Sequence, residues 1–409
     1  MKSRRVEKHA ICRTSHYFSD LCDMTHKSKN LYNSALYAIR QHFFQTKKYL
    51  SYATVAGEFA RSNSDFKSLP RKVSQQTLKL ADQSFKSFFG LLKTTKKSEA
   101  RLPSYLEKSG KYVTIFTKQA LSFTKPGFVK LSGYGVFIKT DKQDIQQIRV
   151  VPKTNYFDVE VIYCVDEPET KTDNCRYLSV DIGLNNLATT ASNVIKPMLI
   201  NGKPLKAINQ YYNKRKAELQ SRLGDKTKTS NRISAITRKR NDKIRDYLHK
   251  ASTWLINQLD SNSINTLIIG ENKGWKQEIN LGKKNNQNFV SVPFNKFKQL
   301  LTYKAKSRGI NVICQEESYT SKASCLSNDH IPVYGSEPNV MNFSGYRKSR
   351  GIYRDKCLGL EINADVNGAY NILRKAVGDF TVDPIEACSW PVSVKISLDT
   401  NPKLCHYWH

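Results

Sequence analysis

Three acidic side chains that are far apart in the sequence each stand beside an expected buried element. Asp181 closes the apolar run in "YLSVDIGLNN", and Glu271 closes the one in "INTLIIGEN". Asp365, in "EINADVNGAYNI", opens a segment whose apolar residues recur at three- and four-residue intervals, which predicts an amphipathic helix. Because an unpaired carboxylate is costly inside a core, we expect all three acids at a sheet edge or in a cleft.

Such a set of acids suits the hydrolysis of phosphodiesters. Negative charge develops on the attacking and leaving oxygens, beside a phosphate that is already anionic. Two divalent cations about 3.5–4 Å apart stabilise both oxygens, and Mg²⁺ takes oxygen ligands such as Asp and Glu. We therefore interpret Asp181, Glu271 and Asp365 as the ligands of one site that holds two Mg²⁺ ions.

Each acid alone has a plainer explanation. Asp181 and Glu271 could belong to ordinary strand-to-turn exits, and Asp365 could be a first-turn acid favoured by the helix dipole. The ordered set is more specific than its members, and it is the set that indicates a nuclease.

The charge of the chain indicates a polyanionic partner. Its 409 residues include 66 Lys and Arg against 35 Asp and Glu, for a formal net charge of +31. Nucleic acid is the usual partner of so basic a protein, although charge alone does not identify a reaction. No apolar run is long enough to cross a membrane, and the N-terminus lacks the apolar core of a signal peptide. We expect a soluble, cytoplasmic protein with no membrane partner.

Four segments carry a resemblance to a known family. They are "LSVDIGLNNLAT", "LIIGEN", "SYTSKAS" and "INADVNGAYNILRKA", and they resemble the split RuvC nuclease of TnpB proteins, the RNA-guided DNA endonucleases of insertion-sequence transposons. The resemblance is strongest from about residue 176 to residue 376. It implies that Asp181, Glu271 and Asp365 are the catalytic, metal-binding acids.

The resemblance also implies an activity and its partners. The expected protein is an RNA-guided, Mg²⁺-dependent DNA endonuclease that cleaves double-stranded target DNA next to a short flanking motif. Its guide would be an omega-type RNA derived from the transposon end, and the protein is expected to act as a monomer with that RNA. The compact type V CRISPR effectors share a similar nuclease and stay an alternative. So do a nuclease-inactive, RNA-guided DNA-binding regulator and a kinase-like phosphate-binding domain, for which "DIG" is the only support.

The periodicity of the chain divides it into regions. Helical spacing dominates residues 18–100, whereas alternation with a period of two marks residues 110–170. Further on, strands are predicted near 177–182, 186–191, 196–200, 264–270 and 310–315. This order is typical of a ribonuclease-H-like sheet and could place Asp181 and Glu271 on adjacent central strands.

Together with the resemblance, these regions imply an α+β multidomain fold: a ribonuclease-H-like (RuvC) α/β nuclease, a β-barrel wedge domain and an inserted helical recognition domain. The expected boundaries are 1–17 and 101–172 for the wedge domain, 18–100 for the recognition domain, 173–318 and 361–376 for the nuclease with a helical insert at about 204–260, 319–360 for an insert that binds target nucleic acid, and 377–409 for a disordered C-terminal tail.

Five polar side chains are candidates for contacts with nucleic acid. Gln75 and Gln76 could pair with adenine edges, and Lys79 lies on the same basic helix. Arg238 and Arg240 belong to the helical insert, whose basic face could flank the cleaved strand. A solvated helix surface is the plainer explanation for many of these residues.

The insert at 319–360 lacks the cysteines of a zinc site. TnpB relatives commonly carry two Cys-x-x-Cys pairs there, whereas this segment has only Cys325 and Cys357. Two thiols cannot complete a tetrahedral site, so we expect no zinc. The insert is then expected to be held by apolar packing, or to become ordered only with nucleic acid. The apolar residues expected to pack are Ile331, Val333, Tyr334, Phe343, Ile352 and Tyr353.

Overall fold

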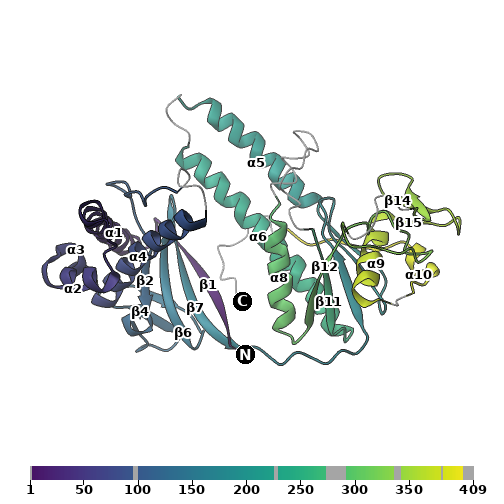
Figure 1. Ribbon diagram of the computed structural model, residues 1–409, viewed down its shortest axis with the longest axis horizontal. Coiled ribbons are helices and arrows are strands. Elements are labelled where there is room, and N and C mark those ends of the chain that lie inside the picture. The colour runs from purple at the N-terminus through teal and green to yellow at the C-terminus, as the bar shows by residue number, and fades with distance from the viewer. Residues whose placement is uncertain are drawn as a thin grey trace. The chain divides into compact units, whose positions relative to one another are not determined.

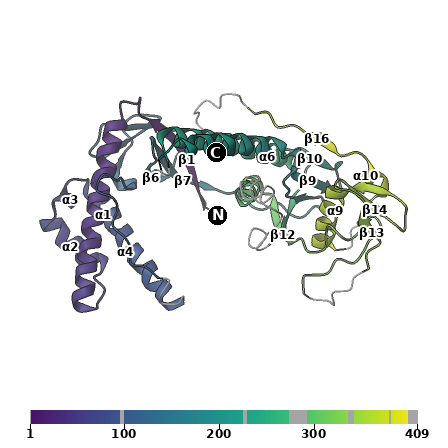
Figure 2. The same cartoon turned by 90° about the horizontal axis from the view of Figure 1, so that it is seen from above.

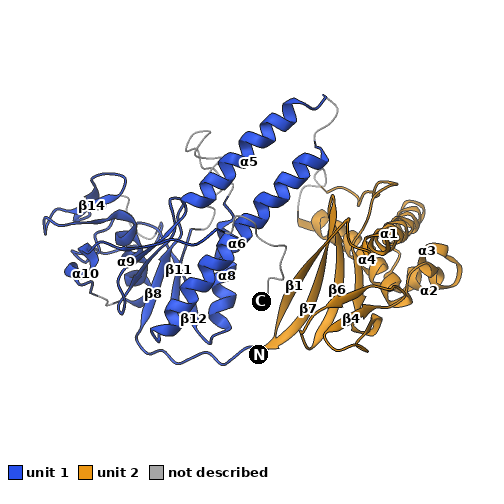
Figure 3. Ribbon diagram, turned by 180° about the vertical axis from the view of Figure 1, so that it is seen from behind, with its two compact units in different colours: residues 1, 167–402 blue, residues 2–166, 403–409 orange. Residues whose placement is uncertain are grey.

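The computed structural model describes residues 2–94, 100–224, 229–272, 292–335, 342–378 and 381–398. The chain is an α+β protein with parallel and antiparallel strands, and it divides between residues 166 and 167 into two compact units (Figure 3). Residues 273–291, shortly after Glu271, lie outside the described residues, as does the end of the chain beyond residue 398. In the described part of the chain, no helix is both long and apolar enough to cross a membrane.

The unit of residues 2–166, drawn in orange in Figure 3 and called the first unit below because it comes first in the sequence, contains two antiparallel sheets. Their strands are β1 (Lys2–Cys12), β2 (Thr114–Thr117), β3 (Leu121–Ser122), β4 (Phe128–Leu131), β5 (Phe137–Lys139), β6 (Ile145–Pro152) and β7 (Tyr156–Asp166), with a 3-10 turn η1 (Lys118–Ala120). One sheet has the order β1-β7-β6-β2 and the other β3-β4-β5. The predicted β-barrel is thus hydrogen-bonded as two separate sheets, because β3 to β5 are short and pair only with one another.

Four helices lie between β1 and β2 in the sequence. They are α1 (Phe18–Thr46), α2 (Tyr52–Ser62), α3 (Ser64–Lys67) and α4 (Arg71–Thr94). The hydroxyl of Ser51 caps α2 by accepting from the backbone of Thr54, and Pro70 directly precedes α4. The helices share a core with the longer sheet, since Leu21 and Phe85 belong to the same buried cluster as Val159. Figure 2 shows α1 to α4 grouped together.

The second unit is built on a six-stranded mixed sheet with the order β12-β11-β8-β9-β10-β16. The strands are β8 (Tyr177–Asp181), β9 (Asn186–Ser192), β10 (Met198–Asn201), β11 (Thr266–Glu271), β12 (Asn311–Glu316) and β16 (Val392–Val394). Strand β11 is parallel to both β8 and β12. The prediction that Asp181 and Glu271 end adjacent strands is therefore confirmed.

Helices cover both faces of this sheet (Figure 1). They are α6 (Asn231–Ser261), α8 (Phe294–Lys306) and α9 (Ala364–Val377), whereas α5 (Lys203–Ser221) packs on α6. Val180 and Ile269 pack with α6 and α8, whereas Ile268 packs with α9. Successive residues of a strand point to opposite faces, so the alternation in β8 and β11 assigns each side chain to one helical layer.

A smaller antiparallel sheet, β13 (Gly345–Arg347), β14 (Ile352–Asp355) and β15 (Glu361–Asn363), precedes α9. After α9 come α10 (Pro384–Cys388) and β16. The expectation of a disordered tail from residue 377 is wrong for this part, because β16 pairs in parallel with β10 and Val394 is buried in the core.

Candidate metal centre

Asp181 lies at the end of β8 on the face that α9 covers. Two residues earlier on the same face, the hydroxyl of Ser179 donates to the carbonyl oxygen of Ala369 at 2.6 Å and so joins the strand to the helix. A Cβ built on Gly368 would lie 3.1 Å from Oδ2 of Asp181. The absent side chain at Gly368 therefore lets α9 approach this carboxylate closely.

Asp365 occupies the first turn of α9. The side chain of Asn363 caps the helix by accepting from the backbone N–H of Asp365 at 3.0 Å and from that of Val366 at 3.2 Å. Nδ2 of Asn186, on β9, donates to Oδ2 of Asp365 at 2.9 Å. The guanidinium of Arg347, on β13, lies 3.4 Å from Oδ1. Both the capping residue and Asn186 thus orient the carboxylate.

The electrostatics connect these two acids. Burial and the neighbouring charge of Asp365 raise the pKa of Asp181 to about 7, although the charge of Arg347 acts in the opposite direction. In the part of the chain that the structure describes, the carboxylate of Asp181 has neither a hydrogen bond nor an ion pair. A carboxylate in such surroundings would be stabilised by a bound cation.

Glu271 is placed differently from the other two acids. Ile269 of β11 pairs with Val180 of β8, so the next residues, Gly270 and Asp181, point to the same face of the sheet. Glu271 follows Gly270, and its side chain therefore points to the opposite face, which α8 covers. There the ammonium of Lys298, on α8, lies 2.5 Å from Oε1 of Glu271. Both side chains are partly exposed, at 21% for Lys298 and 38% for Glu271.

The structure therefore brings Asp181 and Asp365 together and holds Glu271 in an ion pair. Among the described residues, no three His, Cys, Asp or Glu side chains are arranged as they stand to hold a metal ion. The donors fit Mg²⁺ in kind, since all are carboxylates and hard divalent cations prefer oxygen. For Glu271 to join them, it must leave Lys298.

Three neighbours of this centre were not singled out from the sequence. They are Lys298, Arg347 and Glu317. Lys and Arg are too common in this chain for their pairing to be visible without a structure. Glu317 had a usable signal, because it follows β12 directly in "CQEES", just as Asp181 and Glu271 close their own strands.

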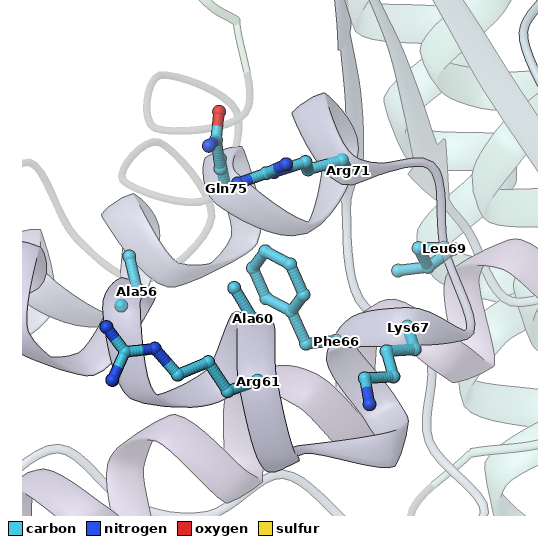
Figure 4. Close-up of a pocket in the computed structure, with 9 residues that line it drawn as sticks. Ala56, Ala60, Arg61, Phe66, Lys67, Leu69, Arg71 and Gln75 are labelled. Carbon is cyan, nitrogen blue, oxygen red and sulfur yellow. The ribbon is translucent and has the colours of Figure 1, made fainter.

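A basic hollow in the first unit contains one predicted contact for nucleic acid. Its volume is about 630 Å³, and α2, α3 and α4 line it with Arg61, Lys67, Arg71 and Gln75 around an apolar floor. Figure 4 shows Arg61 and Lys67 on one side and Arg71 and Gln75 on the other, with Phe66 between them. No acid lines the hollow, so its chemistry suits a phosphate or a base edge.

The other predicted contacts have local partners or open surroundings. Gln76 is partly exposed on α4, and Nζ of the exposed Lys79 lies 5.6 Å from the centre of the Tyr52 ring. Arg238 pairs with Asp242 at 3.6 Å. Arg240 donates to Oδ1 of Asn209, on α5, at 2.7 Å. Burial lowers the pKa of Arg240. Its side chain contributes to the packing of α6 on α5.

The insert around β13 to β15 is held by buried polar groups rather than by the expected apolar ones. Val333 is 56% and Tyr334 79% exposed, and only Tyr353 of the predicted set is fully buried. The carboxylate of Asp355 instead accepts from the hydroxyls of Ser324 and Ser327, and from the backbone N–H of Leu358 at 2.9 Å. Asp355 is itself inaccessible to solvent.

This arrangement also has a characteristic spacing. Ser324 and Ser327 are three positions apart, as are Asp355 and Leu358, which is the spacing of Cys-x-x-Cys pairs. Burial opposes ionisation of Asp355, but the hydrogen bonds outweigh it and keep its pKa below the usual value. The carboxylate of Asp355 thus joins the turn at residues 355–358 to the segment that carries Ser324 and Ser327.

Three buried side chains fasten the insert to α9. Asn367 accepts from the backbone of Cys325 at 2.9 Å and donates to the carbonyl of Ala323 at 2.8 Å. Asn371 also donates to Ala323, and Arg374 donates to the carbonyl of Asp329. The helix that carries Asp365 in its first turn is therefore coupled mechanically to the insert.

Comparison with known proteins supports one assignment. A family model described as "Probable transposase" (OrfB_IS605) matches residues 160–276, and one described as "Cas12f1-like, TNB domain" matches residues 294–372. The TnpB-like protein ORF457 of Acidianus two-tailed virus is 23% identical over 402 residues, covering 86% of this chain and 82% of that protein. The TnpB-like protein MJ0751 of Methanocaldococcus jannaschii is 25% identical over 280 residues, covering 66% and 90%.

Among solved structures, this chain is similar to that of the mini-RNA-guided endonuclease CRISPR-Cas_phi3. Its TM-score is 0.49 at 10% identity, with 94% of each chain covered. The two family models place this chain in the class of transposase-related proteins that carry a Cas12f1-like domain. Together with the two TnpB-like relatives, these matches support membership of the TnpB family.

Proposed function

We propose that this protein is an RNA-guided, Mg²⁺-dependent DNA endonuclease of the transposon-associated TnpB type. It cleaves target DNA beside a short flanking motif. Membership of the TnpB family supports an RNA-guided nuclease in general. The proposal of metal-dependent cleavage rests on one observation, the closeness of Asp365, on α9, to Asp181, on β8. The helix can approach the strand here because Gly368 has no side chain.

The proposed domain roles follow the two units. The mixed sheet with α6, α8 and α9 serves as the ribonuclease-H-like (RuvC) nuclease, and the insert at 319–360 binds target nucleic acid. In the first unit, residues 1–17 and 101–172 act as the wedge that anchors the guide RNA. Residues 18–100 contact the guide–target duplex and the flanking motif, with the basic hollow at Arg71 and Gln75 as one contact.

In this proposal, Asp181, Asp365 and Glu271 bind the metal ions. Two Mg²⁺ ions supply charge stabilisation for the attacking and leaving oxygens of a phosphodiester. Asn186 and the Asn363 cap fix the orientation of Asp365. Glu271 would leave its ion pair with Lys298 and join the other two acids as a metal ligand. Lys298 and Arg347 are then free to approach a phosphate backbone, for which they have the right charge.

The proposed partners are the guide RNA and double-stranded DNA. Base pairing would read the sequence, while the protein reads a flanking motif and the shape of the backbone. A net charge of +31 supplies the attraction for both nucleic acids. We propose that one copy of the protein acts with one omega-type RNA.

One observation favours a second function. Glu271 and Asp365 are each held by a basic side chain, and within the described residues no three acids converge on a metal site. If this arrangement persists on DNA, the protein is a guide-directed DNA-binding regulator that does not cut. The presence of all three acids argues against this function.

The test begins with the protein purified from its native locus. The RNA that copurifies is sequenced, and the complex is incubated with a plasmid library whose flanks are randomised. We expect cleavage in Mg²⁺ that is restricted to certain flanks. Asp181→Ala should abolish cleavage and leave RNA binding nearly unchanged, because this acid faces α9 within the second unit. Target binding without cleavage by the wild-type complex would establish the regulator instead.

A further inference from the structure

Glu317 lies on the same face of the central sheet as Asp181. It directly follows β12, which pairs in parallel with β11, and in that register Gln315 is the partner of Gly270. Two residues beyond Gln315, Glu317 returns to the same face. That face is the one covered by α9, toward which Asp181 points. Glu271, by contrast, is bound to Lys298 of α8.

The side chain of Glu317 extends across the backbone of Gly270. A Cβ built on Gly270 would lie 2.0 Å from Oε1 of Glu317, 2.8 Å from Cδ and 2.9 Å from Cγ. No larger residue could stand at this position without displacing the carboxylate. Because β11 lies between β12 and β8, Glu317 reaches over the intervening strand toward Asp181.

The surroundings of Glu317 are mostly negative. Its carboxylate makes no hydrogen bond or ion pair with any residue that the structure describes, whereas Glu316 binds Lys375 and Asp365 binds Arg347. Burial, followed by the charges of Asp181 and Glu316, raises the pKa of Glu317 to about 8, although the positive charge of Lys298 acts in the opposite direction. Two partly buried acids that face each other without a cation are expected to bind one.

We propose that Glu317 is a fourth carboxylate ligand of the metal centre, joining Asp181 and Asp365 on the α9 face, with Gly270 providing the gap through which it reaches. This inference rests on the proposed function and adds a ligand to the same centre. It also assigns a role to the glycine that precedes Glu271 in "LIIGEN".

The first test measures Mn²⁺ binding to the full-length protein by titration calorimetry, without any cleavage assay. Glu317→Gln preserves the shape of the side chain and removes its charge. We expect its Mn²⁺ affinity to fall by about tenfold or more, as for the loss of a group that supports a metal site. Glu316→Gln is the matched control, because it removes the adjacent charge, whose partner is Lys375. It should bind Mn²⁺ nearly as the wild type does.

The second variant keeps the charge of Glu317 but changes its position. Gly270→Ala should displace Glu317 and weaken Mn²⁺ binding to a similar degree, and combining it with Glu317→Gln should produce little further loss. Unchanged Mn²⁺ affinity in Glu317→Gln, alongside loss of binding in Asp181→Ala, would overturn this inference and leave the proposed function standing. Unchanged binding in both variants would overturn the metal centre altogether.

Discussion

Nζ of Lys298 lies 2.5 Å from Oε1 of Glu271, on the side of the sheet that α8 covers. The ion pair joins the end of β11 to the middle of a helix, and it competes with any cation for the glutamate. The ion pair thus holds one of the three predicted ligands on the opposite side of the sheet from the other two. How strongly it does so can be measured.

Replacing Lys298 should make metal binding tighter. In Lys298→Met, Glu271 no longer has a competing cation, so the Mn²⁺ affinity should rise by up to about fivefold, the upper range for a partly exposed ion pair. Lys296→Met is the control, because Lys296 is exposed on the same helix. Titration calorimetry compares the three proteins. Weaker Mn²⁺ binding in Lys298→Met would mean that Lys298 supports the centre instead of competing with it.

Asp355 should stabilise the insert most at neutral and higher pH. Its pKa is lower in the folded protein than in the unfolded chain, so its contribution is present above the unfolded value of about 4 and is lost as the pH falls through the folded value. Asp355→Asn should lower the free energy of unfolding at pH 7 by about 2 kcal/mol, since a charged hydrogen-bond acceptor is removed. Denaturant unfolding between pH 7 and pH 3 measures the difference.

Two comparisons accompany the Asp355 experiment. Cys357→Ser, at an exposed thiol in the same turn, should leave stability nearly unchanged. A zinc chelator should likewise leave the wild-type unfolding transition where it is. Tightly bound zinc at unit stoichiometry, released together with stability, would contradict our account of the insert.

Lys304 should make the second unit more stable in mildly alkaline solution. Its ammonium is buried among the carbonyl of His249 and the hydroxyls of Ser252 and Thr253, and burial lowers its pKa to about 8 from 10.5. The unfolded chain therefore binds more protons between these two values, so stability rises with pH in that interval. Lys304→Met should lack this rise.

Lys306→Met supplies the comparison for Lys304, because Lys306 is an exposed lysine in the last turn of the same helix. Thermal unfolding of the three proteins from pH 7 to pH 10 separates the effect of Lys304 from that of the other titrating groups. Parallel pH profiles for the wild type and Lys304→Met would show that the buried amine does not titrate in this range.

The basic hollow should contribute through both charge and shape. Arg71→Ala should weaken DNA binding by the guide-loaded protein for all flanks alike and reduce the slope of log affinity against log salt by about 1. Gln75→Ala should change the preferred flank and leave that slope unchanged. Lys93→Ala, exposed near the end of α4, controls for general charge. Equal salt slopes for Arg71→Ala and the wild type would remove the hollow from the interface.

Sequence patterns predicted β8 and β11 of the central sheet well because both strands are mostly apolar. The contact of Asp181 with α9 was also predictable in outline, since both acids flank elements of clear periodicity. The face of Glu271 was not, because it depends on the register that pairs Val180 with Ile269, and a register is set by tertiary packing. The ion pair between Glu271 and Lys298 could therefore not be predicted without knowing that register.

The insert was the least predictable region. Its apolar residues suggested a small core, yet Val333 and Tyr334 are exposed, and Ser324, Ser327 and Asp355 are buried in their place. Serine and aspartate are ordinary turn residues, so nothing in their order announces a buried network. The pairing of β16 with β10 was hidden for a similar reason, since three residues are too few to show a period.

The serine hydroxyls that converge on Asp355 have a consequence for the conditions under which this protein can work. Thiolates that hold a metal are lost to oxidants, whereas hydroxyl and carboxylate groups are chemically inert to them. Cys325, which lies beside this network, is fully buried, and burial raises its pKa well above the usual range, which keeps it unreactive. The exposed thiol of Cys357, in the same turn as Asp355, makes none of the hydrogen bonds described above for this network. The insert should therefore keep its shape under peroxide stress or metal starvation, when a cysteine-built counterpart would come apart.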